Sequence, residues 1–93
     1  MIKDFADSGT KKLFARQGTR RLPTQVLHIA RRKLVMLDAV VSLQDLRVPP
    51  GNRLEKLSGD REGQHSIRIN DQLRICFEWH DGDAYRVEIT DYH

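Results

Sequence analysis

The spacing of hydrophobic and polar positions changes near the middle of the chain. Before Pro49 apolar residues recur at steps of three and four, which is the period of an amphipathic helix. After Pro50 they alternate with polar residues at every second position, as in strands that bury one face. The pattern therefore predicts an α+β fold, with helices in the first half and a sheet in the second.

The helical half divides at its glycines and at Pro23. Residues 2–5 are a candidate first strand, and residues 7–18 a helix that begins at an Asp-Ser cap and stops at a glycine. The main helix is expected over residues 23–41, with the basic residues 31–33 largely away from its apolar side. That apolar side is expected to consist of Val26, Leu27, Ala30, Leu34, Leu37 and Val41.

The second half predicts four strands, at residues 52–57, 64–69, 72–79 and 84–90. The dipeptide Asp81-Gly82 between the last two is typical of a tight hairpin turn. Antiparallel strands with such alternation place one face on the helices and leave the other open to solvent. The helix-facing residues of the last two strands are expected to be Leu73, Ile75, Phe77 and Trp79, then Tyr85, Val87 and Ile89.

The composition is that of a small globular protein. With 93 residues, 39% apolar and 31% charged, the chain is expected to form a single domain over residues 1–93. It shows neither a signal-peptide pattern nor a run long enough to span a membrane, so a cytoplasmic protein is expected. The single cysteine and the four scattered histidines form no metal-ligand pattern, and we expect no cofactor.

Charge is distributed unevenly along the chain. Residues 1–56 hold 12 Lys/Arg against 5 Asp/Glu, a balance of +7, whereas residues 57–93 hold 4 against 8, a balance of −4. Arginine outnumbers lysine 11 to 5, and its planar fork suits bidentate contact with phosphate. A polyanionic partner such as nucleic acid is therefore a candidate, and a merely solvated basic face is the alternative.

The alternation also predicts which polar side chains share a face. It places Arg68, Arg74 and Arg86 on the polar side of their strands, and Tyr92 on the same side as Arg86. One interpretation is that these arginines form cross-strand charge pairs, each contributing up to ~1 kcal/mol. The other is that, with the terminal Tyr92-His93, they form a cationic floor for a phosphodiester.

Cleavage of RNA without a metal needs a base for the 2′-hydroxyl, a cation for the phosphate and an acid for the leaving oxygen. His93 is a candidate acid, since Asp91 and the terminal carboxylate favour its protonated form. Arg74 is a candidate phosphate clamp, and Tyr92 is a candidate for stacking on a base. The alternatives are that Tyr92 closes the sheet edge and that His93 is a frayed terminal residue.

Three segments carry a resemblance that covers essentially the whole chain: "MIKDF", "NRLEKLSGDREGQHSIRINDQLRICF" and "GDAYRVEITDYH". Together they resemble a HigB-type toxin of the RelE superfamily, the ribosome-dependent messenger-RNA endonucleases of bacterial type II toxin-antitoxin modules. The resemblance implies N-terminal helices packed on one face of a small mixed, mostly antiparallel sheet. It also implies that Asp91, Tyr92, His93 and Arg74 belong to the catalytic site.

The resemblance extends to the basic residues before the central strands. Arg61 in "GDREG" matches a basic residue of the family, and Arg68 lies in the same stretch. Arg53 and Lys56 flank Glu55 and are expected to offset its repulsion of phosphate. These four residues are the candidate RNA contacts.

One departure from the family pattern concerns catalysis. Well-known members have a histidine where this chain has Glu55, a proline where it has Lys56 and a lysine where it has Ser58. A carboxylate can accept the 2′-hydroxyl proton, so Glu55 is the candidate general base in place of that histidine. The substitution predicts a toxin that is weaker or differently tuned.

The resemblance further implies partners. These are a HigA-like antitoxin with a helix-turn-helix fold, the ribosome with a message in its A site, and operator DNA only through the antitoxin complex, with no membrane. The alternative is a catalytically impaired relative that acts as a nucleic-acid-binding or antitoxin-dependent regulatory module. A metabolic enzyme is disfavoured because the chain has no Gly-rich phosphate loop and no nucleophile elbow.

Overall fold

The computed structural model describes residues 1–17 and 22–91. The helices come first, as α1 (Ser8–Ala15) and α2 (Thr24–Ala39), and are followed by two 3₁₀ turns, η1 (Leu43–Arg47) and η2 (Pro50–Asn52). The rest is strand, with one further 3₁₀ turn between the first two strands: β1 (Glu55–Lys56), η3 (Gly59–Arg61), β2 (Gln64–Arg68), β3 (Leu73–His80) and β4 (Asp83–Asp91). Gly18, which was expected to end the first helix, lies outside the described residues, as do Tyr92 and His93.

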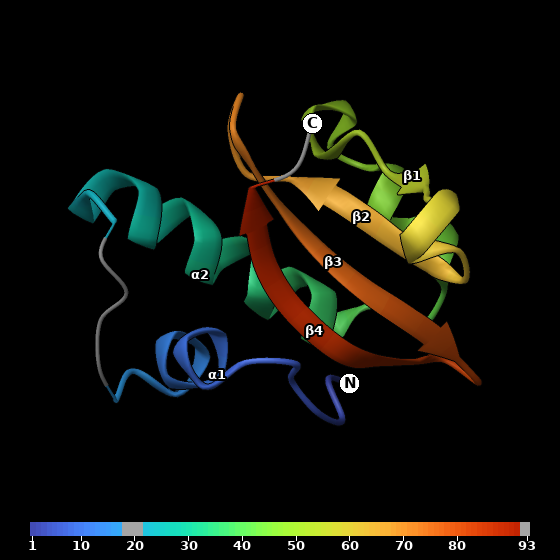
Figure 1. The fold of residues 1–93 in the computed structure, drawn as a ribbon, viewed down its shortest axis with the longest axis horizontal. Coiled ribbons are helices and arrows are strands. Elements are labelled where there is room, and N and C mark those ends of the chain that lie inside the picture. The colour runs from blue at the N-terminus through green and yellow to red at the C-terminus, as the bar shows by residue number, and fades with distance from the viewer. Residues whose placement is uncertain (18–21, 92–93) are drawn as a thin grey trace.

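The strands form one sheet in the order β1-β2-β3-β4, and each neighbouring pair is antiparallel. The N-terminal segment adds two isolated parallel bridges to the outer edge of β4, Ile2 with Ala84 and Phe5 with Val87. The first strand predicted at residues 2–5 is thus reduced to two contacts. The predicted α+β fold with a mixed, mostly antiparallel sheet is confirmed (Figure 1).

The hydrophobic core lies between the two helices and one face of the sheet (Figure 1). Complete burial of a large apolar side chain contributes about 1.5–3 kcal/mol, so this layer supplies most of the stabilisation. Helix α2 crosses the sheet and brings its apolar side onto β3 and β4. The fully buried members from α2 and from the two strands are Ala30, Leu34, Leu37, Ile75, Phe77, Ala84 and Val87.

Two residues of the main helix differ from the prediction. Helix α2 ends at Ala39, so Val41 lies beyond its apolar stripe and is 81% exposed. Lys33, expected on the basic outer face, is only 7% exposed. The reason is a polar partner inside the fold, because the Lys33 ammonium donates a hydrogen bond to the side-chain oxygen of Asn52.

A β-bulge in β4 changes which side chains share a face. Cys76 lies opposite Glu88 and Glu78 lies opposite Tyr85, so β4 has one residue more than β3 in this interval. Arg86 takes up the extra residue with a φ of 55°. Tyr85 therefore lies on the face of Glu78 and not on the helix side. The uniform alternation predicted for residues 84–90 is wrong at Tyr85 and Arg86.

Asn52 connects the helical half to the loops that lead into the sheet. Its fully buried amide donates to the carbonyl oxygen of Leu46 at 3.1 Å and to that of Val48 at 3.4 Å, while its oxygen accepts from Lys33. Burial lowers the pKa of Lys33 below its ordinary value, and the neighbouring cations of Arg32 and Arg68 lower it further. One amide therefore satisfies a buried cation and two loop carbonyls.

We predict that Asn52→Ala lowers the free energy of unfolding by about 2–4 kcal/mol, because it leaves a buried ammonium and two carbonyl groups without their partner. Urea titration followed by circular dichroism measures the change. Gln44→Ala is the matched control, since the exposed Gln44 amide accepts a hydrogen bond from the exposed Arg47 side chain, and we expect a loss below ~0.5 kcal/mol. Equal losses in the two variants would contradict the role of Asn52.

Candidate active site

The sheet face that points away from the helices, here called the polar face, follows from the strand register, because directly opposed residues point to the same side. One row crosses all four strands and consists of Glu55, Ser66, Cys76 and Glu88. The next row consists of Arg68, Arg74 and Thr90. The register thus brings two arginines, two carboxylates, two hydroxyls and a thiol onto one surface.

The polar face is partly covered, which differs from the predicted open face. Ser66 and Cys76 are fully buried. Arg61 reaches over the sheet from η3, where its guanidinium lies 2.9 Å from the Glu88 carboxylate and donates to the side-chain oxygen of Gln64 at 3.0 Å. Burial raises the pKa of the Cys76 thiol, with the Arg61 cation acting in the opposite direction. Cys76 is therefore held as a neutral thiol and is unsuited to be a nucleophile.

Arg74 is held on this face by two hydrogen bonds. Its Nε donates to the hydroxyl of Ser66 at 2.7 Å, and its Nη2 donates to the backbone carbonyl of Arg53 at 2.6 Å. The same Nη2 lies 3.9 Å from a carboxylate oxygen of Glu55. The Arg74 side chain is 13% exposed, so its guanidinium is fixed in direction and still reachable from solvent. The hydroxyl and the carbonyl hold it without neutralising its charge.

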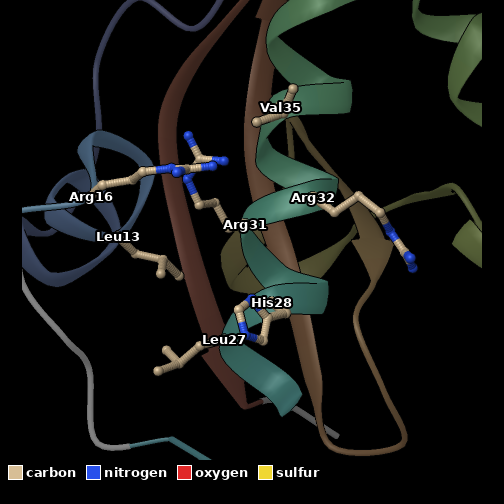
Figure 2. A pocket seen from close by; sticks show the side chains of 7 residues that line it. All are labelled: Leu13, Arg16, Leu27, His28, Arg31, Arg32 and Val35. Carbon is tan, nitrogen blue, oxygen red and sulfur yellow. The ribbon is translucent and has the colours of Figure 1, made fainter. Parts of the chain in front are cut away.

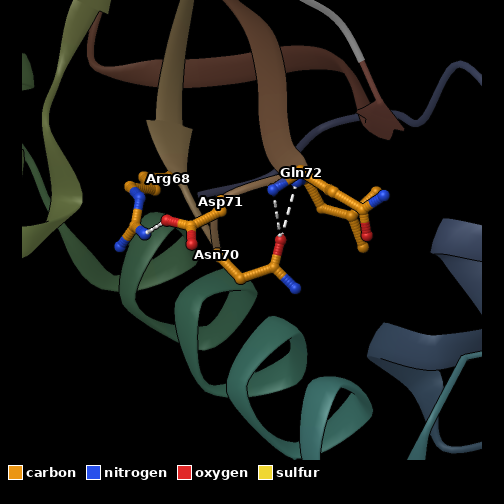
Figure 3. A network of polar contacts seen from close by, with 5 residues as sticks. Arg68, Asn70, Asp71 and Gln72 are labelled. Carbon is orange, nitrogen blue, oxygen red and sulfur yellow. Dashed lines mark hydrogen bonds and ion pairs between the residues drawn. The ribbon is translucent and has the colours of Figure 1, made fainter.

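A pocket of about 310 Å³ opens beside the Arg74 guanidinium. The hairpin turn between β2 and β3 closes one end of it, where the side-chain oxygen of Asn70 accepts from the backbone N–H groups of Gln72 and Leu73, both at 2.8 Å (Figure 3). The Arg68 guanidinium pairs with Asp71 in the same turn. The pocket is lined by Arg53, Glu55, Arg68, Asn70, Asp71, Gln72 and Arg74.

Four of the residues singled out in the sequence thus meet at this pocket, namely Arg53, Glu55, Arg68 and Arg74. Arg68 and Arg74 converge on the polar face as predicted. They are directly opposite each other, and their carboxylate partners differ: Arg68 pairs with Asp71 in its own turn, and Arg74 lies 3.9 Å from Glu55 of β1.

The other candidates lie elsewhere. Arg61 is bound to Glu88 at the far end of the first row. Lys56 is opposite His65, which places it on the other face of the sheet. Asp91 ends β4 opposite Leu73, next to the row that holds Arg74.

His65 is the histidine nearest in sequence to the position where the family histidine is missing. It packs on the helix side of the sheet, with its ring centroid 6.0 Å from that of Phe77. Burial lowers the pKa of His65 below its ordinary value, and the Lys56 ammonium adds to the decrease. A neutral imidazole on the opposite face cannot supply the base beside Arg74. Two carboxylates of the described residues line the pocket, Glu55 and Asp71, and Asp71 is paired with Arg68.

The sequence-based prediction gave Ser66 no role in the site. Only the pairing of β2 with β3, which sets Ser66 opposite Cys76, brings its hydroxyl to the Nε of Arg74. In the sequence, the one sign of this role is that Ser66 lies two positions before Arg68 and so shares its face of the strand. The strand register is needed to show that Ser66 contacts Arg74.

Among the residues that the structure describes, no group of three or more His, Cys, Asp or Glu side chains is arranged to hold a metal ion. Within the same residues no helix has the length and apolar character needed to cross a lipid bilayer.

Comparison with solved structures shows which proteins share this fold. The fold matches the crystal structure of a mutant of E. coli YafQ over 98% of this chain and 93% of that one, with a TM-score of 0.62 and 10% identity. It also matches a YoeB-YefM complex from Staphylococcus aureus over 100% of this chain and 98% of that one, with a TM-score of 0.57 and 15% identity.

The sequence comparisons are more specific. Residues 3–93 match the model of the RelE-like toxin of type II toxin-antitoxin system HigB. Toxin HigB-1 of Vibrio cholerae serotype O1 is 41% identical over 85 residues, which is 90% of each chain, and Endoribonuclease HigB of Proteus vulgaris is 36% identical over 93 residues, the full length of both. The chain belongs to the HigB family of RelE-like toxins.

We predict that Ser66→Ala loosens the Arg74 guanidinium, because Nε loses its acceptor on a fully buried hydroxyl. The Nε–H proton of Arg74 should then exchange with solvent at least about tenfold faster, and the free energy of unfolding should fall by about 1–2 kcal/mol. Two-dimensional NMR of the arginine side chains measures the exchange. Ser58→Ala, at an exposed position, should change neither quantity, and unaltered exchange in Ser66→Ala would contradict the contact.

Proposed function

We propose that this chain is the endoribonuclease toxin of a type II toxin-antitoxin system and cuts messenger RNA on the ribosome, with the pocket beside Arg74 as the place where the scissile phosphate binds. The observation that carries the proposal is the Arg74 guanidinium, held by Ser66 and Arg53 and directed into a pocket next to a carboxylate. Membership of the HigB family and the name of the Proteus vulgaris relative support the reaction class.

Arg74 stabilises the phosphorane in this proposal. Attack of the 2′-oxygen on phosphorus adds negative charge to the non-bridging oxygens, and a guanidinium that is already oriented interacts with that charge without reorganising. Nη2 is 3.9 Å from Glu55, longer than a tight ion pair, so a phosphate oxygen can approach it without breaking a strong bond. The Ser66 and Arg53 contacts use other hydrogens of the fork and remain in place.

Glu55 is the proposed base. It takes the proton of the 2′-hydroxyl as the O2′–P bond forms, which leaves a 2′,3′-cyclic phosphate when the P–O5′ bond breaks. His93 is the proposed acid and gives its proton to the departing 5′-oxygen, so the two proton transfers balance. Tyr92 is proposed to stack on a base beside the cut, and Asp91 to favour the charged form of His93.

The ribosome is proposed to supply what this site lacks. A carboxylate base, a terminal histidine acid and a single clamping arginine are a small catalytic set, and a message held in the A site is presented in a reactive geometry. Orientation of that kind can lower a barrier by about 7–11 kcal/mol. The proposed setting is therefore the cytoplasm, where messages are translated, and Arg53, Lys56, Arg61 and Arg68 are the proposed contacts to RNA.

A second candidate function has one observation in its favour. Both arginines that face Cys76 carry carboxylate partners, Arg61 with Glu88 and Arg74 with Glu55. If Glu55 occupies Arg74 in place of phosphate, the chain is a catalytically impaired relative that regulates through its antitoxin. A helix-turn-helix antitoxin of the HigA type is the proposed partner in either case, and operator DNA is bound only through that complex.

In translation reactions with purified ribosomes we expect the wild type to cut message, and to cut the same RNA at least ~10³-fold more slowly without ribosomes. His93→Ala and Glu55→Gln should each lower the single-turnover rate on the ribosome by about 10²–10⁴, the usual contribution of an acid or a base. Arg86→Ala is the matched control, because Arg86 sits at the exposed bulge away from the pocket, and its rate should equal that of wild type.

The two functions give opposite results for Glu55→Gln. A faster rate in this variant would identify Glu55 as a competitor of phosphate and favour the impaired relative. An unchanged rate in His93→Ala would contradict the assignment of the acid.

A further inference from the structure

A second pocket lies between α1 and α2, where it shares no residue with the pocket beside Arg74. It has a volume of about 590 Å³ and is here called the helix groove. Leu13 of α1 and Leu27 and Val35 of α2 give it an apolar floor, and Arg16 and Arg31 stand at its edge (Figure 2). Val35 is 43% exposed, so part of this floor faces water.

The residues of α2 that line the groove form a stripe of their own. Leu27, Arg31 and Val35 follow one another at steps of four, which aligns them on one side of the helix. The core stripe of Ala30, Leu34 and Leu37 lies on another side. Helix α2 therefore has a second face that is apolar at both ends and cationic in the middle.

The two arginines at the edge have no anionic partner in the described residues. Figure 2 shows the Arg16 and Arg31 side chains reaching toward each other across the space between the helices. The Nε of Arg31 is buried and bonds to no group of residues 1–17 and 22–91. A buried N–H donor without an acceptor is unfavourable, and two like charges at one groove repel each other.

The helices themselves supply no carboxylate for this site. Neither α1 nor the first three turns of α2 contains an acid, and Asp38 near the end of α2 accepts a hydrogen bond from the backbone N–H of Ile2. The groove thus combines unbalanced positive charge with exposed apolar surface. A ligand that fits it carries carboxylates beside apolar side chains.

We propose that the helix groove is the docking site for an acidic amphipathic helix of the antitoxin, whose apolar face packs on Leu27 and Val35 and whose carboxylates pair with Arg16 and Arg31. The identity of this partner rests on the proposed function, whereas its chemistry rests on the groove. RNA is the poorer fit, because a sugar-phosphate backbone would satisfy the arginines and leave the apolar floor in water.

The test measures binding of the purified antitoxin from the same operon, and of overlapping 20-residue peptides of it, by fluorescence anisotropy. Arg16→Glu and Arg31→Glu should each raise the Kd at least about tenfold, since a carboxylate then faces a carboxylate. Val35→Glu, at a position that is already exposed, should do the same. The antitoxin peptide that binds should carry Asp or Glu. Replacing one of these acids by Lys in the peptide should restore its affinity for the Arg31→Glu variant of the toxin.

Matched controls separate docking from folding. Lys11→Glu makes the same charge change on α1 outside the groove, and Gln25→Glu introduces the same side chain at an exposed position of α2. Both should bind as wild type. Message cleavage on the ribosome should stay within about twofold of wild type in every groove variant, because none of these residues lies at the pocket beside Arg74.

Three results would overturn the proposal. The groove variants could bind the antitoxin with the Kd of wild type, or they could bind ribosomal RNA more weakly while antitoxin binding is intact. The wild-type toxin could also be a dimer that the Val35→Glu substitution dissociates. Absence of antitoxin binding to the wild type would overturn it as well. If the wild type does not cleave message but the groove variants still bind the antitoxin more weakly, the proposed enzyme activity is wrong and the proposed docking site is supported.

Discussion

The fixed direction of the Arg74 guanidinium is the interaction on which the polar face depends. It requires the hydroxyl of Ser66 on the adjacent strand and the carbonyl of Arg53 in the segment before β1. Both partners are placed by pairing, since β2 aligns with β3 and β1 with β2. A shift of one residue between β2 and β3 would turn Ser66 toward the helices and leave the Nε–H of Arg74 without its acceptor. The geometry of the proposed phosphate site therefore depends on the sheet register.

The same constraint explains why carboxylates are present beside the arginines. Arg61 and Arg74 flank a buried thiol on a covered face, where an uncompensated cation is costly, and Glu88 and Glu55 lie within ion-pair distance of them. The two pairs differ in length, at 2.9 Å for Arg61 and 3.9 Å for Arg74. The shorter pair, Arg61 with Glu88, helps to cover the polar face. The longer pair leaves the Arg74 guanidinium accessible to the proposed phosphate.

The sequence predicted the two helices and β2 to β4 because these depend on local periodicity. The strands predicted at residues 2–5 and 52–57 are reduced to two isolated bridges and to Glu55–Lys56. Two side-chain directions needed tertiary information. Arg86, which takes up the bulge, is a polar residue at a position where regular alternation also requires one, so the pattern around Tyr85 contains no mark of the bulge. Lys33 looked like a surface cation because its stabilising partner, Asn52, is nineteen residues away. The convergence of Arg53 and Arg74 depends on the chain fold between η2 and β1 and likewise has no local signature.

The most direct test of the account is the ribosome-dependent cleavage rate of Arg74→Lys. Lysine keeps the positive charge and cannot make the simultaneous contacts of Nε with Ser66 and of Nη2 with Arg53. If an oriented guanidinium stabilises the phosphorane, the single-turnover rate should fall by at least about 10²-fold while the fold, followed by circular dichroism, is unchanged. Wild-type cleavage by Arg74→Lys would show that charge alone suffices and would contradict the central claim.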